Sequence, residues 1–255
     1  MKKSTFYRAL IYIAGLLILA MGLTLNTKAG LGVSPIISVS YSASEITHHN
    51  FGNTTFVLYS IFVIMELILH AIRERKYEKK LAKSLLRETT NGTKDLLKQA
   101  NRVDRRLIFL MDVLQIPLSM VFTRFLNIFS AALPDFSTKD MTWPVVGERF
   151  VVLILALICT GIGAAMSLNM RLVPNPGDGI VQAIADCIHK SVGFTKNCFD
   201  LLNVTITIIV SLICTGQLHG VGVGTILAVI CVGRTIAVFN HFTKEKFTAL
   251  AGIED

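Results

Sequence analysis

Residues 167–194 read SLNMRLVPNPGDGIVQAIADCIHKSVGF, a polar stretch rich in Gly and Pro between two long apolar segments. An earlier stretch, residues 24–53, reads TLNTKAGLGVSPIISVSYSASEITHHNFGN and follows the same plan. Each contains Leu-Asn, then a cation two positions later, and passes through a Gly/Pro elbow into a short helix-like segment. Each then reaches a Gly that is followed two positions later by Thr. The sequence therefore predicts two copies of one structural unit.

The composition indicates an integral membrane protein. Of the 255 residues, 52% are hydrophobic and 16% are charged, whereas roughly a quarter of the residues of a typical soluble domain are charged. Apolar runs long enough to cross roughly 30 Å of hydrocarbon recur along the whole chain. Most of the net charge of +8 lies in one loop, which is typical of the cytoplasmic loops of membrane proteins and argues against a nucleic-acid partner.

The apolar runs predict six transmembrane spans, at about residues 6–27, 54–72, 107–133, 150–168, 196–215 and 225–242. Each elbow adds a short helix of about 13–16 residues, which is short for a full span. Such a helix either re-enters the side it came from or crosses while tilted, so six and eight crossings both stay open. The predicted fold class is an all-α polytopic membrane protein with six transmembrane helices and two short re-entrant or tilted helices, built as two internal repeats.

The chain divides into five predicted segments. Residues 1–72 hold the first two spans and the first elbow helix, and residues 107–133 form the third span. Between them, residues 73–106 form a basic loop with twelve Lys and Arg residues. An external loop at 134–148 precedes the second repeat at 149–255. The third and sixth spans align at a constant offset that places Arg124 on Arg234 and Phe129 on Phe239.

The basic loop predicts the orientation of the protein in the membrane. A loop with so many cations is expected in the cytoplasm. With re-entrant elbow helices, both termini then lie in the cytoplasm and the second repeat is inverted relative to the first. The leucines of the loop have rough helical spacing. This pattern fits either an amphipathic helix on anionic lipid headgroups, broken near Asn91-Gly92, or a solvated linker that docks a cytoplasmic protein.

The NPGDG segment at residues 175–179 is the strongest candidate for a binding site. Irregular backbone at membrane depth is stable where it lines a cavity or is buried in protein, and broken helices of inverted repeats often bind solutes. Asp178 binds a ligand or cation in one interpretation and only caps the helix in the other, as Ser34 would in the first copy. The predicted solute-binding residues are Asp178, Asn175, Gly177, Arg234, Arg124, Asp200, Asn26 and Asn169.

Several of these candidates also have structural interpretations. Arg124 and Arg234 could bind an anion together, or each could form an ion pair, as Arg234 could with Asp200. Asn26 and Asn169 could be helix C-caps. Glu66 and Asp112 also fall inside predicted spans, where they could extend towards the cytoplasmic side.

No pattern of catalysis is present. The sequence contains no HExxH, no Gly-x-Ser-x-Gly and no recognisable metal-ligand spacing, and its five cysteines form no CxxC pair. The alternating glycines at 220–224 lack a Walker lysine, which excludes a nucleotide site of that type. We therefore expect no enzyme activity, no metal and no cofactor.

A family resemblance agrees with this organisation. The AGLGVSP elbow at residues 29–35 resembles the elbow of the bacterial YczE/YyaS/YitT-like membrane proteins, and Pro176-Gly177-Asp178-Gly179 resembles their second elbow. The GVGTIL segment at 222–227, with Val232-Gly233-Arg234, is similar to their closing helix. The resemblance implies a protein of the bacterial inner membrane and names neither a substrate nor a catalytic residue.

Two functions follow from these patterns. The first is a small secondary transporter or solute permease, with a small solute bound at the interface between the repeats. The second is a non-transporting accessory or regulatory protein of the lipid bilayer that docks a cytoplasmic partner through its basic loop.

Overall fold

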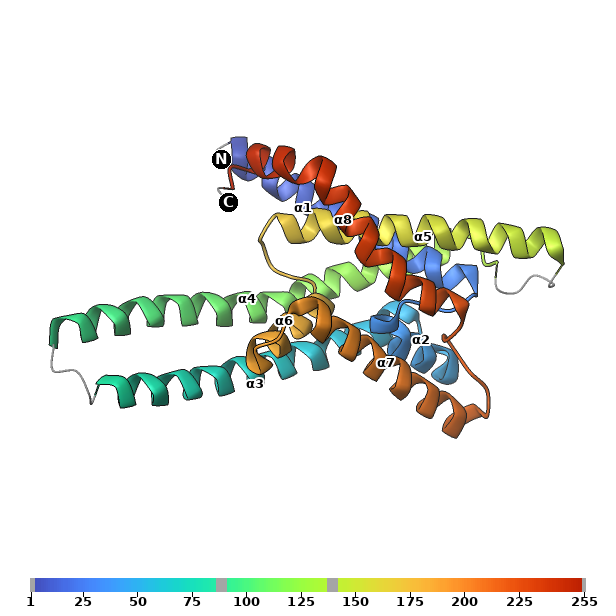
Figure 1. Cartoon of the computed structure of the whole chain (residues 1–255). Coiled ribbons are helices and arrows are strands. Elements are labelled where there is room, and N and C mark those ends of the chain that lie inside the picture. Colours follow the sequence, from blue (N-terminus) through green and yellow to red (C-terminus); the bar gives the residue numbers. More distant parts are fainter. Residues whose placement is uncertain (1–2, 86–90, 137–141, 254–255) are drawn as a thin grey trace. The chain divides into compact units, whose positions relative to one another are not determined.

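The computed structural model describes the backbone of residues 3–85, 91–136 and 142–253, and the side chains of these residues except 77–107. Within these ranges the chain folds into eight helices and no strand (Figure 1). They are α1 (Lys3–Ala29), α2 (Pro35–Thr47), α3 (Phe51–Leu85), α4 (Asn91–Ala132), α5 (Trp143–Asn169), α6 (Pro176–Ile188), α7 (Val192–Thr215) and α8 (Val223–Ala251). Six of them, all except α2 and α6, are long and apolar enough to cross a membrane. The predicted fold class is confirmed.

The order of the helices repeats. A long helix, a short helix and two long helices form α1–α4, and the same order follows in α5–α8. The short helices α2 and α6 each have 13 residues, begin with a proline and end at a left-handed histidine. The same spacing separates Pro35 from Pro176 and His48 from His189. Proline suits the first turn because its missing N–H has no partner there, and a left-handed residue ends a helix. The two elbow helices are therefore equivalent elements.

Three predicted boundaries differ from the structure. Helix α5 begins at Trp143, so part of the predicted external loop is helical; Pro144 suits this first turn because it needs no backbone donor. Helix α3 continues to Leu85 and α4 begins at Asn91, so the described backbone of the predicted basic loop extends the helices of spans two and three. The charged and leucine residues there are good helix formers, which explains the extension. The predicted amphipathic surface falls on side chains outside the described residues.

The chain forms two compact units. The first unit comprises Met1–Leu58, Met120–Leu172 and Lys196–Asp255. Within it, α1 packs along α5, and both contact α8 (Figure 1). Glycines permit the close approach of α1 and α5, since a Cβ at Gly22 would lie 2.5 Å from the backbone nitrogen of Thr160. Small residues at helix contacts are typical of membrane proteins, where close van der Waals packing replaces the hydrophobic effect between helices.

Helix α2 joins the first unit through hydroxyl groups. Ser38 Oγ lies 2.8 Å from Thr207 Oγ1, and Ser42 Oγ lies 2.7 Å from Ser211 Oγ. Both pairs connect α2 with α7 and are buried. We call these four residues the neutral elbow contact. The hydroxyl groups satisfy one another, so the contact brings no charge into the apolar interior.

The second unit comprises Tyr59–Ser119 and Val173–Thr195. It contains most of α3, the first two thirds of α4, and the whole second elbow helix α6. Its interior holds buried polar side chains, among them Glu66, Asp112 and Gln115. The second unit therefore buries two acids close together, whereas the buried Asp200 of the first unit forms an ion pair with Lys196.

Candidate functional site

Helix α3 carries two ionisable residues on one face. Glu66 and His70 are four positions apart, and side chains at this spacing lie one above the other on a helix. The apolar span of α3 runs from Phe51 to Lys76, so Glu66 lies roughly 15 Å along the helix from its end. Glu66 is 3% exposed, and the side chain of His70 is 18% exposed.

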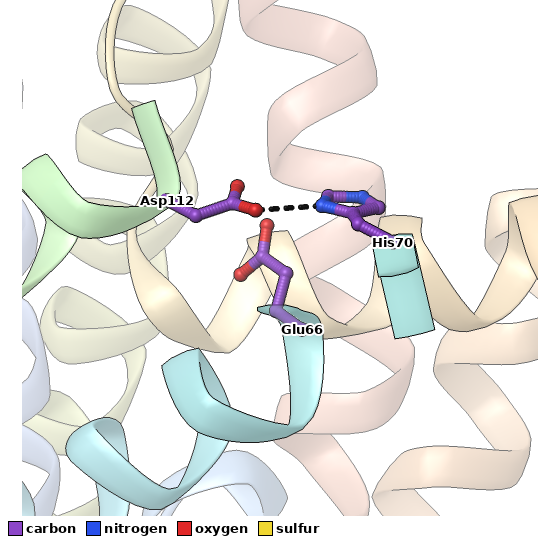
Figure 2. A group of neighbouring side chains, drawn as sticks. All are labelled: Glu66, His70 and Asp112. Atoms are coloured by element: carbon purple, nitrogen blue, oxygen red, sulfur yellow. Dashed lines mark hydrogen bonds and ion pairs between the residues drawn. The ribbon is translucent and has the colours of Figure 1, made fainter. Parts of the chain in front are cut away.

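Helix α4 presents Asp112 and Gln115 to this face of α3. His70 Nδ1 lies 2.7 Å from Asp112 Oδ2, and Gln115 Nε2 donates to Glu66 Oε2 over 3.0 Å. Asp112 is 3% exposed and Gln115 is fully buried. Figure 2 shows the Glu66 carboxylate directed towards the hydrogen-bonded pair of Asp112 and His70. Two carboxyl groups and an imidazole therefore meet inside the second unit.

We call Glu66, His70 and Asp112 the Glu66 cluster. One nitrogen or oxygen atom from each of the three lies within 4.8 Å of the others. Among the described side chains, no lysine or arginine pairs with Glu66 or Asp112. Buried carboxylates are costly at membrane depth and are normally balanced by a partner. In the described part of the chain, the basic group that contacts these acids is His70, through its bond to Asp112.

The second elbow helix covers the cluster. Helix α6 lies along α3 and makes three contacts with it. Asn175 Nδ2 donates to the Tyr59 hydroxyl (3.3 Å), and Cys187 Sγ donates to the carbonyl oxygen of Leu69 (3.6 Å). Arg73 Nη1 of α3 donates to Asp186 Oδ2 of α6 (2.6 Å). The cluster lies between the first of these contacts and the last along α3. The discontinuous part of the second repeat is thus in direct contact with the ionisable face of α3.

Gly179 of α6 lies against the Glu66 carboxylate. A Cβ built at position 179 would lie 2.6 Å from Glu66 Oε2 and 2.9 Å from Glu66 Oε1. Such distances are far below van der Waals contact, so any larger residue at position 179 would require the Glu66 carboxylate to move. The glycine of the NPGDG segment therefore shapes the site, a role that the sequence did not reveal.

Three predicted site residues belong to this unit. Asn175 occupies the N-cap position of α6, but its side chain makes no capping bond and donates to Tyr59 instead. Asp178 is not the cap; it lies in the first turn of α6, where a carboxylate interacts favourably with the helix dipole. Gly177 is buried beside it. Ser34 has the N-cap position of α2 and likewise makes no side-chain capping bond.

The other predicted site residues belong to the first unit. Arg124 is exposed and donates to Asn53 Oδ1 over 3.3 Å. Arg234 is exposed and borders an open apolar groove of about 500 Å³. Asp200 is buried and forms an ion pair with Lys196, one helical turn before it, at 3.4 Å. These contacts describe three local environments and do not gather the residues around one ligand.

Neither Asn26 nor Asn169 occupies the C-cap position that was one interpretation of its place in the sequence. Asn26 lies inside α1, which continues to Ala29. It is fully buried, and neither amide atom has a hydrogen-bond partner among the described residues. Asn169 is the last residue of α5, the C-cap being Met170, and its Nδ2 donates to Asn240 Oδ1 over 2.8 Å. Asn26 therefore keeps unused hydrogen-bonding capacity, whereas Asn169 holds α8 against α5.

The Glu66 cluster was not predicted from the sequence. Glu66 and Asp112 were interpreted as acids that could extend to the membrane surface, and neither His70 nor Gln115 was singled out. The signal was present as Glu-x-x-x-His on one span and Asp-x-x-Gln on the next, spacings that place each pair on one helix face. Whether two such faces meet depends on the register of the two helices, which their sequences do not state.

These observations define a multi-pass helical membrane protein with an internal repeat and a buried cluster of ionisable residues within its spans. Residues 6–86 and 99–241 match the model of a family of unknown function, DUF6198, and the chain belongs to that family. No curated protein and no solved structure matches the chain.

Proposed function

We propose that this protein is a small secondary transporter that couples solute movement to a cation bound at the Glu66 cluster. The observation that carries the proposal is the contact between the short helix α6 and Glu66, one of two neighbouring buried acids that have no lysine or arginine partner among the described side chains. In transporters built from inverted repeats, coupling ions bind beside broken helices. Ionisable residues inside spans commonly lie on ion pathways.

The neutral elbow contact supports a functional role for the charges. At the spacing that relates the two elbow helices, Gly179 corresponds to Ser38, Glu66 to Thr207 and His70 to Ser211. The contact that α6 makes with Glu66 is therefore made in the other repeat by a serine and a threonine, 2.8 Å apart. Packing of an elbow helix against a span does not require ionisable residues. Their presence in one copy calls for another explanation, and cation binding supplies it.

The transporter has the topology predicted from its charges. The elbow helices re-enter the membrane, six helices cross it, and both termini and the basic segment lie in the cytoplasm. A short helix of 13 residues is about 20 Å long, well below the roughly 30 Å of the hydrocarbon core, which supports re-entry. We further propose membership of the wider YczE/YyaS/YitT-like group and residence in a bacterial inner membrane.

The solute would bind near the N-terminus of α6. Asn175 and Asp178 flank this end of the helix, and their amide and carboxylate groups would bind polar or cationic groups of a solute. Arg124, Arg234, Asp200, Asn26 and Asn169 stay candidate residues of the solute pathway.

Reconstitution with a mixture of candidate solutes tests the proposal. Proteoliposomes holding the full chain would be incubated with a defined mixture of amino acids, carboxylates, nucleosides and sugars, and their contents measured by mass spectrometry. We expect one or more solutes to enter with the wild type and not with Glu66→Gln, whereas Thr207→Val keeps uptake. Equal contents in wild-type and protein-free vesicles, under every imposed ion gradient, would reject the transporter.

An accessory role is the second candidate. It is favoured by the helical backbone that continues from the apolar span ending at Lys76 as far as Leu85. This role predicts that removing residues 79–98 abolishes the cellular phenotype while Glu66→Gln leaves it intact. The transporter predicts the reverse.

A further inference from the structure

We propose that Glu66, His70 and Asp112 form a binding site for one divalent transition-metal cation of the Zn²⁺ type. This inference deepens the proposed function by naming the class of the coupling or transported cation, and it rests on that function for the role of the ion but not for its binding. The donor set is one imidazole nitrogen and two carboxylates. Imidazole favours zinc and its first-row neighbours, whereas Mg²⁺ and Ca²⁺ prefer all-oxygen sites.

The spacing of the donor atoms suits one small ion. In a zinc site with ligand bonds of about 2.0–2.2 Å, neighbouring ligand atoms lie about 3.2–3.5 Å apart. The three donor atoms of the cluster lie within 4.8 Å of one another, and His70 Nδ1 and Asp112 Oδ2 lie 2.7 Å apart. A shift of about 1 Å in the side chains would therefore centre them on a metal. The ion would replace the proton that joins His70 and Asp112.

A buried amide provides a second observation. Gln115 is fully buried, and its Oε1 has no hydrogen-bond partner among the described residues. Its Nε2 donates to Glu66, so the amide is already directed at the cluster. Rotation about the last side-chain bond exchanges the two amide atoms and would present the oxygen to a cation. A buried acceptor without a donor is uncommon in folded proteins and here adjoins the proposed ligands.

The charge of the cluster selects a divalent ion. Two carboxylates and a neutral imidazole carry a charge of about −2 when no proton is bound, and a divalent cation brings the group to neutrality. A monovalent ion would leave one buried negative charge, which is unfavourable in a medium of low dielectric constant. Arg73, three positions after His70, is paired with Asp186 at 2.6 Å, so its charge is already offset.

The ligands of the proposed site differ in their exposure to solvent. The His70 side chain is 18% exposed, whereas Glu66 and Asp112 are nearly inaccessible. An ion would therefore meet the imidazole first and the carboxylates next. The backbone of Gly179 lies against the Glu66 carboxylate. The equivalent span residues of the second repeat, Thr207 and Ser211, are poor metal ligands, so we expect one metal per chain.

Metal titration of the purified, untagged full chain in detergent tests the site. The probes are Zn²⁺ alone, followed by calorimetry, and Co²⁺ alone, followed by visible absorption. We expect one Zn²⁺ per chain, and a loss of affinity of at least about 100-fold in Glu66→Gln, His70→Gln and Asp112→Asn, because each removes a ligand. The matched controls, Glu148→Gln and His219→Gln, change an exposed and a half-buried residue of the first unit and should bind as the wild type does.

A variant that gains a spectroscopic signal controls for the possibility that loss of binding reflects misfolding. In His70→Cys, a thiolate would replace the imidazole, and the Co²⁺ complex should acquire a sulfur-to-metal charge-transfer band in the near ultraviolet. The inference is overturned if the wild type binds no Zn²⁺ or Co²⁺ at millimolar concentration, or if all three ligand variants bind unchanged. Metal binding without any flux in proteoliposomes would reject the transporter alone. Solute flux without metal binding would reject only the metal site.

Discussion

The two elbow helices have the same construction but meet their neighbouring spans with different chemistry. Helix α2 contacts α7 through pairs of hydroxyl groups, Ser38 with Thr207 and Ser42 with Ser211. Helix α6 contacts α3 where Gly179 lies against Glu66. One contact is neutral and satisfied within itself, and the other exposes a carboxylate to a helix backbone. The comparison shows that packing an elbow helix against a span requires close contact but no charge. The carboxylate of Glu66 is an addition found in one of the two contacts.

The difference extends to the third span of each repeat. At the offset that relates Arg124 to Arg234, Asp112 corresponds to Gly222 and Gln115 to Thr225. Thr225 Oγ1 donates to the carbonyl oxygen of Gly220, a local bond at the start of α8. Every member of the Glu66 cluster therefore has a neutral counterpart, so this cluster has no ionisable equivalent in the second repeat.

The largest expected effect comes from replacing the ionisable residues of α3 and α4 by neutral residues, as in the equivalent helices α7 and α8. The triple variant Glu66→Thr/His70→Ser/Asp112→Asn should lose measurable Zn²⁺ binding, since all three ligands are gone. Its melting temperature should stay the same or rise, because it removes two buried acids that have no lysine or arginine partner among the described side chains. Calorimetry with Zn²⁺ and a thermal melt of the same sample measure both. A triple variant that melts far below the wild type would show that the charges are structural.

A smaller effect is expected from the glycine that covers the cluster. Gly179→Ala places a Cβ 2.6 Å from Glu66 Oε2, so the carboxylate must turn away from the site. We expect Zn²⁺ affinity to fall by about 10- to 100-fold, the range seen when support around a metal ligand is lost. Gly193→Ala is the matched control, because nothing lies within 4 Å of a Cβ built there. Equal affinities in Gly179→Ala and the wild type would argue against contact between α6 and the cluster.

Changes in the neutral elbow contact should affect stability alone. Ser42→Ala leaves the Ser211 hydroxyl without its partner at 2.7 Å. The expected loss is about 0.5–1.5 kcal/mol, the usual range for one hydrogen bond within a membrane protein. Zn²⁺ affinity should not change. The free energy of unfolding in mixed micelles and the calorimetric titration give the two values, and a shifted Zn²⁺ affinity would contradict the assignment.

The smallest effect is expected at the ion pair between α3 and α6. Arg73 and Asp186 are 2.6 Å apart, but their side chains are 49% and 35% exposed. Exposed pairs of this kind contribute about 0–1 kcal/mol. Arg73→Gln should therefore lower the melting temperature by a few degrees at most. A larger loss would mean that this pair, rather than packing, holds α6 on α3.

The fold could be predicted to a large extent because the length of each apolar run, and the Gly and Pro residues between runs, determine the helices locally. Both elbows were recognisable from their sequence. The short helices begin at Pro35 and Pro176, and proline is favoured at the first position of a helix. The helix ends were harder to place. Asn26 looked like a C-cap until α1 proved to continue to Ala29, and the charged segment after Arg73 continues the helix because charge does not end one.

The candidate site could be predicted only in part. The NPGDG segment was recognised as unusual, and Asp178 was predicted to bind a ligand or to cap the helix, but the contact of Gly179 with Glu66 was not predicted. The bond between His70 and Asp112 joins residues 42 positions apart. It depends on the relative register and rotation of α3 and α4, which many side chains decide together. A single sequence contains the residues of such a site without stating that they meet.

The ligands of the bound ion test the central claim most directly. A zinc-edge X-ray absorption spectrum of the full chain, loaded with one equivalent of Zn²⁺, reports the number and type of atoms around the metal. We predict one imidazole with oxygen ligands at about 2.0–2.2 Å, and no sulfur. Two or more imidazoles, or a sulfur ligand at about 2.3 Å, would place the ion away from the Glu66 cluster and contradict the account.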